Sequence, residues 1–108
     1  MQVYSSSRSD LIDMTNPMWV RTTVDRCLSK TQTLLHGVII TPHKTKCADI
    51  TIYNGESTTD EQVIYLCTGD TASKVVNFDP PLYLDRGLYV DIGGDVDDCL
   101  IQFTVGNP

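Results

Sequence analysis

One stretch, Asp79 to Val105, constrains the fold more than any other part of the chain; it reads DPPLYLDRGLYVDIGGDVDDCLIQFTV. Apolar and polar side chains alternate over residues 88–92 and again over 101–105, which is the period of a half-buried β-strand. Between them, Gly93-Gly94-Asp95 supplies residues that reach positive φ cheaply, as a tight turn requires. Pro80 and Pro81 cannot donate to a sheet ladder, so they mark the entry to this unit. We therefore expect a β-hairpin that supplies much of the core of a small all-β domain.

The rest of the chain carries similar strand signals. Alternating or continuous apolar runs predict strands over 17–25, 33–41, 47–53, 62–67 and 73–78, and Asn54-Gly55 is the strongest short turn signal. A helical period sustained over three turns is not found. The expected fold is all-β: a single small β-sandwich or jelly roll of about seven to eight strands with an N-terminal arm. Its inward positions are predicted to be Ile50, Ile52, Ile64, Leu66, Val76, Phe78, Leu88, Val90, Ile101 and Phe103.

The expected organisation is an arm over residues 1–16 followed by a sandwich domain over 17–108. The arm is mostly polar and buries too little apolar surface to order itself, so we expect Met1 to Asp13 to be held by another chain. A total of 108 residues is the length of one domain, and 41% hydrophobic residues argue against wholesale disorder.

The start of the chain and its cysteines indicate the compartment in which the protein is made. No apolar run approaches the roughly 20 residues of a membrane helix, and the N-terminus lacks the apolar region of a secretory signal. We therefore expect synthesis in a reducing cytoplasm and no membrane partner. Cys27, Cys47, Cys67 and Cys99 form no C-x-x-C pair and are expected to be free thiols that pack as small apolar residues.

The net charge of −6 hides an asymmetry between the two halves of the chain. Six basic and three acidic residues up to Ala48 give +3, whereas two basic and eleven acidic residues from Asp49 onward give −9. An acidic majority argues against nucleic acid as a partner, because phosphate neutralisation needs a basic stripe. The asymmetry predicts either an ordinary solvated surface or a two-ended module that is docked at its basic end and solvated at its acidic end.

Catalytic and metal-binding patterns are weak. The chain contains no phosphate loop, G-x-G-x-x-G, G-x-S-x-G or H-E-x-x-H, and only two histidines, so no enzyme activity and no cofactor are expected. Calcium prefers oxygen ligands, and the final turn carries a cluster of carboxylates, but their spacing departs from the EF-hand pattern. We expect no metal; the weak candidate ligands are Asp91, Asp95, Asp97 and Asp98.

A family resemblance rests on ADITIYNGEST, a strand ending in TGD, FDPPLYLDRGLYVDIGG and CLIQFTV. Together they resemble a small β-sandwich type of tailed-phage virions, in which A-x-I-T-V-Y-x-G precedes P-L-x-x-x-x-G-L-Y-V-x-x-G. The match covers Ala48 to Val105. The residues that carry it are Tyr53, Gly55, Pro81, Leu82, Gly87, Leu88, Tyr89, Val90 and Gly93. The resemblance implies a capsid decoration (cement) protein, a head fibre or a small tail-associated component.

The function expected from these features is structural and non-enzymatic. We expect a capsid decoration protein that forms a homo-oligomer, a trimer or a dimer, and binds the major capsid protein on the surface of the virion. The alternative is a carbohydrate- or receptor-binding module of a phage fibre or tail, which exposed tyrosines on one face would favour; the candidates are Tyr53, Tyr65, Tyr83 and Tyr89. The residues predicted for the capsid or subunit interface are Val3, Tyr4, Arg8, Trp19, Arg21, Arg26, Lys30, Lys44 and Lys46.

Overall fold

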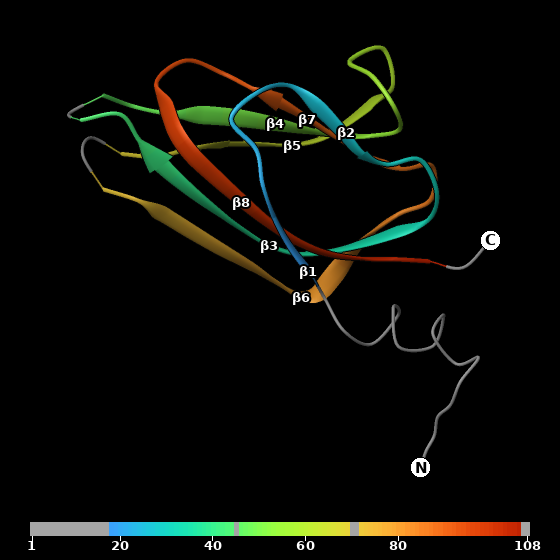
Figure 1. Cartoon of the computed structure of the whole chain (residues 1–108). Coiled ribbons are helices and arrows are strands. Elements are labelled where there is room, and N and C mark those ends of the chain that lie inside the picture. The colour runs from blue at the N-terminus through green and yellow to red at the C-terminus, as the bar shows by residue number, and fades with distance from the viewer. Residues whose placement is uncertain (1–17, 45, 70–71, 107–108) are drawn as a thin grey trace.

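The computed structural model describes residues 18–44, 46–69 and 72–106, and these form two four-stranded antiparallel sheets (Figure 1). The strands are β1 (Met18–Arg21), β2 (Arg26–Ser29), β3 (Thr33–Pro42), β4 (Asp49–Asn54), β5 (Glu61–Cys67), β6 (Lys74–Leu84), β7 (Leu88–Ile92) and β8 (Val96–Val105). No helix occurs among the described residues, so none there is long and apolar enough to cross a membrane.

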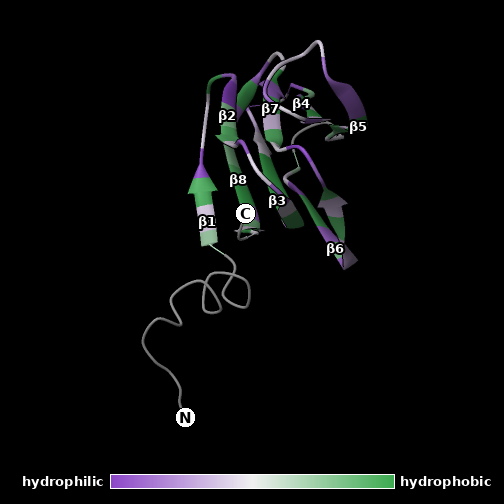
Figure 2. Ribbon diagram, turned by 90° about the vertical axis from the view of Figure 1, so that its right-hand side faces the viewer, coloured by the Kyte–Doolittle hydropathy of each residue, from purple (hydrophilic) through white to green (hydrophobic). Residues whose placement is uncertain are grey.

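The strand order identifies the type of sandwich. Sheet A has the order β1-β8-β3-β6 and sheet B the order β2-β7-β4-β5, as the labels of Figure 2 show. The first strand pairs with the last, the second with the seventh, the third with the sixth and the fourth with the fifth. The chain thus resembles one long hairpin rolled into two layers, which is the jelly-roll form of a sandwich. The predicted all-β fold class is confirmed.

The core lies between the two sheets. β3 is central in sheet A, where β6 and β8 pair with its two sides, as its nearly continuous apolar run predicts. Of the predicted core, Ile64, Val76 and Phe78 are only partly buried and pack against the edge of the cluster, while the other members are buried. The buried hydrophobic residues are Leu35, Val38, Ile40, Ala48, Ile50, Ile52, Leu66, Leu84, Leu88, Val90, Cys99, Ile101 and Phe103.

The predicted final hairpin is wrong in its pairing. Its two strands exist, but β7 pairs with β2 and β4 in sheet B, whereas β8 pairs with β1 and β3 in sheet A. The turn between them bonds to the start of β4 and to the β3–β4 loop: the Gly93 N–H donates to the Asp49 carbonyl (2.8 Å), and the His43 N–H donates to the Asp95 carbonyl (2.8 Å). A glycine-containing turn can pass between layers as readily as it closes a hairpin.

The strand predicted over 17–25 is also corrected, because the chain leaves sheet A after Arg21 and enters sheet B at Arg26. Thr22 makes this break, since its hydroxyl donates to the Val24 carbonyl (2.8 Å) and accepts from the Val24 N–H (3.4 Å). A threonine that bonds its own backbone two residues on forms a local turn that competes with the sheet ladder.

Pro80 and Pro81 lie inside β6 rather than at the entry to a hairpin. β6 is an edge strand of sheet A, and its pairing with β3 jumps from Gly37↔Asn77 to Leu35↔Leu82. Residues 78–81 therefore fall in an interruption of the ladder. An edge strand tolerates prolines at such a place because no neighbouring carbonyl needs their missing amide hydrogen.

Candidate functional site

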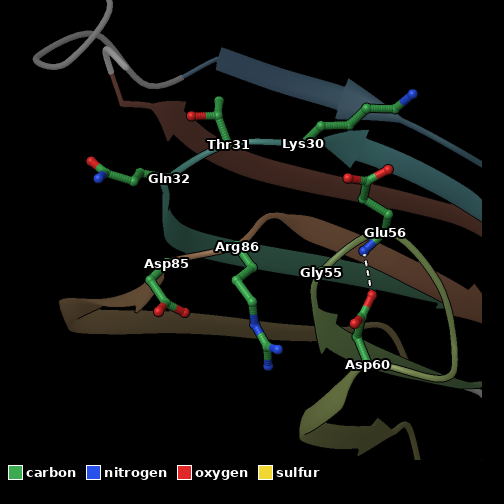
Figure 3. Close-up of a pocket in the computed structure, with 8 residues that line it drawn as sticks. All are labelled: Lys30, Thr31, Gln32, Gly55, Glu56, Asp60, Asp85 and Arg86. Atoms are coloured by element: carbon green, nitrogen blue, oxygen red, sulfur yellow. Dashed lines mark hydrogen bonds between the residues drawn. The ribbon is translucent and has the colours of Figure 1, made fainter.

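Three connections meet at one end of the sandwich and enclose an open cleft of about 540 Å³ (Figure 3). We call it the end cleft. It lies between the β2–β3 turn, the β4–β5 loop and the β6–β7 turn. The side chains and backbone that line it are those of Lys30, Thr31, Gln32, Gly55, Glu56, Asp60, Asp85 and Arg86.

The side chain of Asn54, at the end of β4, joins two of these connections. Its amide Nδ2 donates to Asp85 Oδ1 (2.7 Å), and its Oδ1 accepts from the backbone N–H of Arg86 (2.9 Å). Asn54 is buried, so each of these bonds satisfies a polar group that would otherwise be costly to desolvate. The β6–β7 turn is therefore held against the end of β4 by side-chain hydrogen bonds.

Backbone packing joins all three connections. Gly87 has a φ of +148°, and a Cβ there would lie 2.5 Å from the Ser29 carbonyl oxygen and 2.8 Å from the Gly55 carbonyl oxygen. Only glycine permits the β6–β7 turn to approach both neighbours so closely. Within the β4–β5 loop, Asp60 Oδ2 accepts from the backbone N–H groups of Glu56 (2.8 Å) and Ser57 (3.2 Å). The walls of the cleft are thus fixed in place.

Several polar side chains in the cleft have no partner in the described part of the chain. The side chains of Lys30, Gln32 and Glu56 form no hydrogen bond or ion pair there. The Arg86 guanidinium is not among these: its Nη2 forms an ion pair with Glu61 Oε1 at 3.7 Å, longer than a hydrogen bond, and it lies between Asp85 and Asp60 in Figure 3. The end cleft therefore presents both donors and acceptors to solvent.

A smaller apolar hollow of about 90 Å³ adjoins the end cleft and shares Gln32 with it. We call it the Tyr83 hollow, since the Tyr83 side chain lines it and is 59% exposed. Its other lining residues are Thr33, Leu34 and Gly106. A polar cleft and an apolar hollow thus lie next to each other.

The outer face of sheet A carries an apolar band. Ile39 on β3 pairs with Leu100 on β8 and with Val75 on β6. The residues next to them that belong to or pack against the core are Val38, Ile40, Cys99, Ile101 and Val76, so Ile39, Leu100 and Val75 face outward. Val75 is 61% exposed, and Trp19 on β1 is 46% exposed on the same face. Sandwich strands normally turn polar residues outward. We define the outer apolar band as Ile39, Val75 and Leu100, with Trp19 one pair along β1. The Leu34–Tyr83 pair on the same face is separated from this band by the polar pairs of Asn77 and Gln102 with Gly37.

The outer face of sheet B differs, because it combines tyrosines with carboxylates. The rings of Tyr53 and Tyr89 meet edge to face with centroids 6.2 Å apart, and the Tyr65 hydroxyl donates to Asp49 Oδ2 (3.1 Å). Partial burial, together with the negative charges of Asp25 and Asp49, raises the pKa of Asp91. Of the four tyrosines predicted to share a face, Tyr83 lies instead in sheet A.

The predicted interface residues do not form one surface. Trp19 and Arg21 lie on the outer face of sheet A and Arg26 on β2 of sheet B, while Lys30 lines the end cleft. Lys44 and Lys46 lie in the β3–β4 loop at the opposite end of the sandwich. Val3, Tyr4 and Arg8, with the arm over residues 1–16, lie outside the described residues, so their predicted contact with another chain stays a prediction.

The expected separation into a basic and an acidic end is wrong. Arg21 forms an ion pair with Asp98 (3.0 Å), and His43 lies 3.1 Å from Asp97. The sheet brings the basic β3–β4 loop next to the acidic turn, since Thr41 pairs with Asp98. Antiparallel pairing of an early strand with a late one thus interleaves charges that the sequence keeps apart.

The weak metal candidates are spread over two sheets. Asp91 is on β7, Asp95 is in the β7–β8 turn, and Asp97 and Asp98 are on β8, where they engage His43 and Arg21. Among the described residues, no three histidine, cysteine, aspartate or glutamate side chains are grouped as metal ligands.

The thiols of Cys27, Cys67 and Cys99 are free, so no two of the four cysteines form a disulfide. Cys99 packs in the core as a small apolar residue, as predicted, whereas Cys47 and Cys67 are exposed, so the prediction does not hold for all four. Burial, with the nearby charge of Asp98, raises the pKa of the Cys99 thiol to about 12.

This difference predicts selective alkylation. In native protein at pH 8, iodoacetamide should modify Cys67 and react with Cys99 at least about a hundredfold more slowly, because Cys99 is both inaccessible and protonated. Peptide mass spectrometry after timed quenching measures the two rates. In urea the two rates should converge. Equal rates in the native protein would contradict the burial of β8.

Comparison with known proteins adds nothing to this geometry, since no family model, no curated protein and no solved structure matches the chain.

Apart from Lys30, which is predicted for the interface, the cleft residues are not predicted as a site. Asn54-Gly55 is predicted as a turn and Gly55 also carries the resemblance, whereas Asp85-Arg86-Gly87 enters only as part of the resemblance. The available signal was the presence of polar side chains beside both turn glycines.

Proposed function

We propose that the chain is a non-enzymatic structural protein of a tailed-phage virion, a capsid decoration protein that oligomerises and binds the major capsid shell. The observation that carries the proposal is the outer apolar band. An apolar row that crosses a sheet on its solvent side typically marks a surface for another protein. The resemblance of Ala48 to Val105 to small virion sandwiches supports the same conclusion.

The band suits a docking surface in its composition. Trp19 on edge strand β1 is a large aromatic side chain at one border of the band, and the largely exposed Val75 on edge strand β6 forms the other border. Aromatic residues of this kind dominate the binding energy of protein interfaces. The Arg21–Asp98 ion pair lies beside the band and is solvated, so it contributes little to affinity.

The test is rebinding to capsid shells of the phage that encodes the protein, after the shells have been stripped of it. Val75→Asp places an unpaired charge in the band and should weaken co-sedimentation with the shells about tenfold or more. Val63→Asp is the matched control, because Val63 lies on β5, the edge strand of the other sheet, and is also exposed. That control should bind as the unmodified protein does.

Sedimentation velocity of the free protein tests the expected dimer or trimer. Equal binding by both aspartate variants would contradict docking through the band. A protein that never co-sediments with the shells would contradict the decoration role itself.

A further inference from the structure

The end cleft contains polar side chains that form no hydrogen bond or ion pair within the described fold. Asn54 and one oxygen of Asp60 are committed to holding the connections together. Lys30, Gln32 and Glu56 are not, and in Figure 3 the Glu56 side chain extends toward the β2–β3 turn that carries Lys30. Solubility alone does not require unpaired groups of both signs to line a concave surface whose walls are fixed.

The balance of charge in the cleft selects a class of ligand. Two cationic side chains, Lys30 and Arg86, are mixed with three carboxylates, Glu56, Asp60 and Asp85. A phosphate or sulfate group would approach the carboxylates, and an amine would approach the two cations, so neither is well matched. A hydroxyl group both donates and accepts, and can therefore bond to either kind of side chain. The cleft suits a neutral ligand with many hydroxyl groups.

The Tyr83 hollow supplies the second requirement of such a ligand. A sugar ring has hydroxyl groups at its rim and C–H groups on its faces, and an exposed aromatic ring is a suitable surface for those faces. The Tyr83 ring is available for this contact, with Leu34 beside it. Gln32 borders both spaces, so one ligand can reach the polar cleft and the apolar hollow together.

We propose that the end cleft and the Tyr83 hollow together bind a short neutral oligosaccharide. Hydroxyl groups along the ligand bond to Arg86, Glu56 and Gln32, and one sugar unit packs on Tyr83. The cleft volume of about 540 Å³ falls within the usual range for small-ligand sites. Because backbone packing and Asn54 already fix the three connections, little conformational entropy is lost on binding. This site is independent of the shell-docking role.

The first experiment is an array of neutral gluco-, galacto- and manno-oligosaccharides printed beside sialylated, sulfated and amino-sugar oligosaccharides. Binding to at least one neutral member is expected, with weaker signals from the charged ones. Absence of any neutral binding overturns the proposal. Preferential binding of the anionic or cationic members overturns it as well, because the mixed charge of the cleft would then not be the basis of recognition.

The second experiment is isothermal titration of the strongest neutral member into variants of the full chain. Arg86→Ala and Glu56→Ala should each raise Kd about tenfold, as loss of a charged hydrogen-bond partner does. Tyr83→Ala should raise Kd by a similar factor. Neither charged side chain forms a hydrogen bond on which the fold depends, and circular dichroism melts verify that each variant folds.

The matched control is Tyr65→Ala, since Tyr65 is an exposed tyrosine on the outer face of sheet B. Its Kd should be unchanged. A loss of binding in Tyr65→Ala, with full binding retained in Arg86→Ala, would place the sugar on sheet B and overturn the assignment to the end cleft. Val75→Asp, which tests shell docking, should leave sugar binding unchanged, because Val75 lines neither the end cleft nor the Tyr83 hollow.

Discussion

Replacing Phe103 with alanine is expected to lower the free energy of unfolding by about 3–5 kcal/mol. Phe103 is only 3% exposed, and its strand β8 lies between β1 and β3, where Met18 and Leu35 are its cross-strand neighbours. Truncation removes the transfer free energy of a buried ring and leaves a cavity that strands paired on both sides cannot close. Urea denaturation followed by fluorescence of Trp19 measures the loss.

Phe78→Ala is the matched control, because Phe78 belongs to edge strand β6 and packs against the core with part of its surface in solvent. Phe78→Ala should lower the free energy of unfolding by a smaller amount, about 1–2 kcal/mol. Both phenylalanines were predicted to be buried, and only the strand position separates them. Equal losses for the two variants would show that the position of β8 at the centre of sheet A is incorrect.

The strands were predictable because each strand turns the side chains of one face toward the core. Residues such as Ile50 and Ile52, or Ile101 and Phe103, alternate with polar neighbours along a single strand, and that pattern depends only on local geometry. The all-β class follows from the number of such segments and the absence of a helical period. Local pattern therefore determined most of the elements and much of the core.

Strand pairing was not predictable in the same way, because it depends on partners distant in sequence. The segments 88–92 and 101–105 look like the two arms of a hairpin, yet each is closer in space to strands from the first half of the chain. Likewise, Thr22 ends β1 through a side-chain bond that no apolar pattern reveals. The same long-range pairing places Asp98 beside Arg21 and invalidates the charge polarity read along the sequence.

The end cleft was even harder to predict than the strand pairing, because it forms only where the topology brings three distant connections together. Its lining comes from residues 30–32, 55–60 and 85–86, and each segment alone is an ordinary polar turn. The jelly roll brings all three to one end because β2, β4 and β6 finish there. The outer apolar band needs the register of β3 with β6 and β8, since Leu100, Ile39 and Val75 are far apart in sequence.

The band and the end cleft involve different elements, which gives the two proposals separate readouts. The band occupies the solvent side of sheet A, and the cleft lies across the connections at one end. Tyr83 lines the hollow and is separated from the band by the polar pairs of Asn77 and Gln102 with Gly37. A protein docked through the band therefore leaves the cleft and the hollow open to a glycan.

Replacing Gly87 with alanine should lower the free energy of unfolding by about 2–4 kcal/mol, and it should also disrupt the end cleft. The added Cβ would lie 2.5 Å from the Ser29 carbonyl oxygen and 2.8 Å from the Gly55 carbonyl oxygen, at a φ of +148° that side chains rarely adopt. Both contacts are with backbone, which cannot rotate away as a flexible side chain can. The β6–β7 turn must then move away from its two neighbours, carrying Asp85 and Arg86 with it.

Gly94→Ala provides the comparison, because a Cβ at Gly94 meets no atom within 4 Å. The free energy of unfolding of Gly94→Ala should lie within about 1 kcal/mol of that of the unmodified protein. Without a clash, the substitution changes only the conformational freedom of the backbone. Urea denaturation measures both variants, and amide chemical shifts of residues 30–32 and 55–60 report whether the cleft changes. Shifts confined to residues next to Gly87, with stability preserved, would mean that the three connections are not held together as described and that the cleft is not preformed.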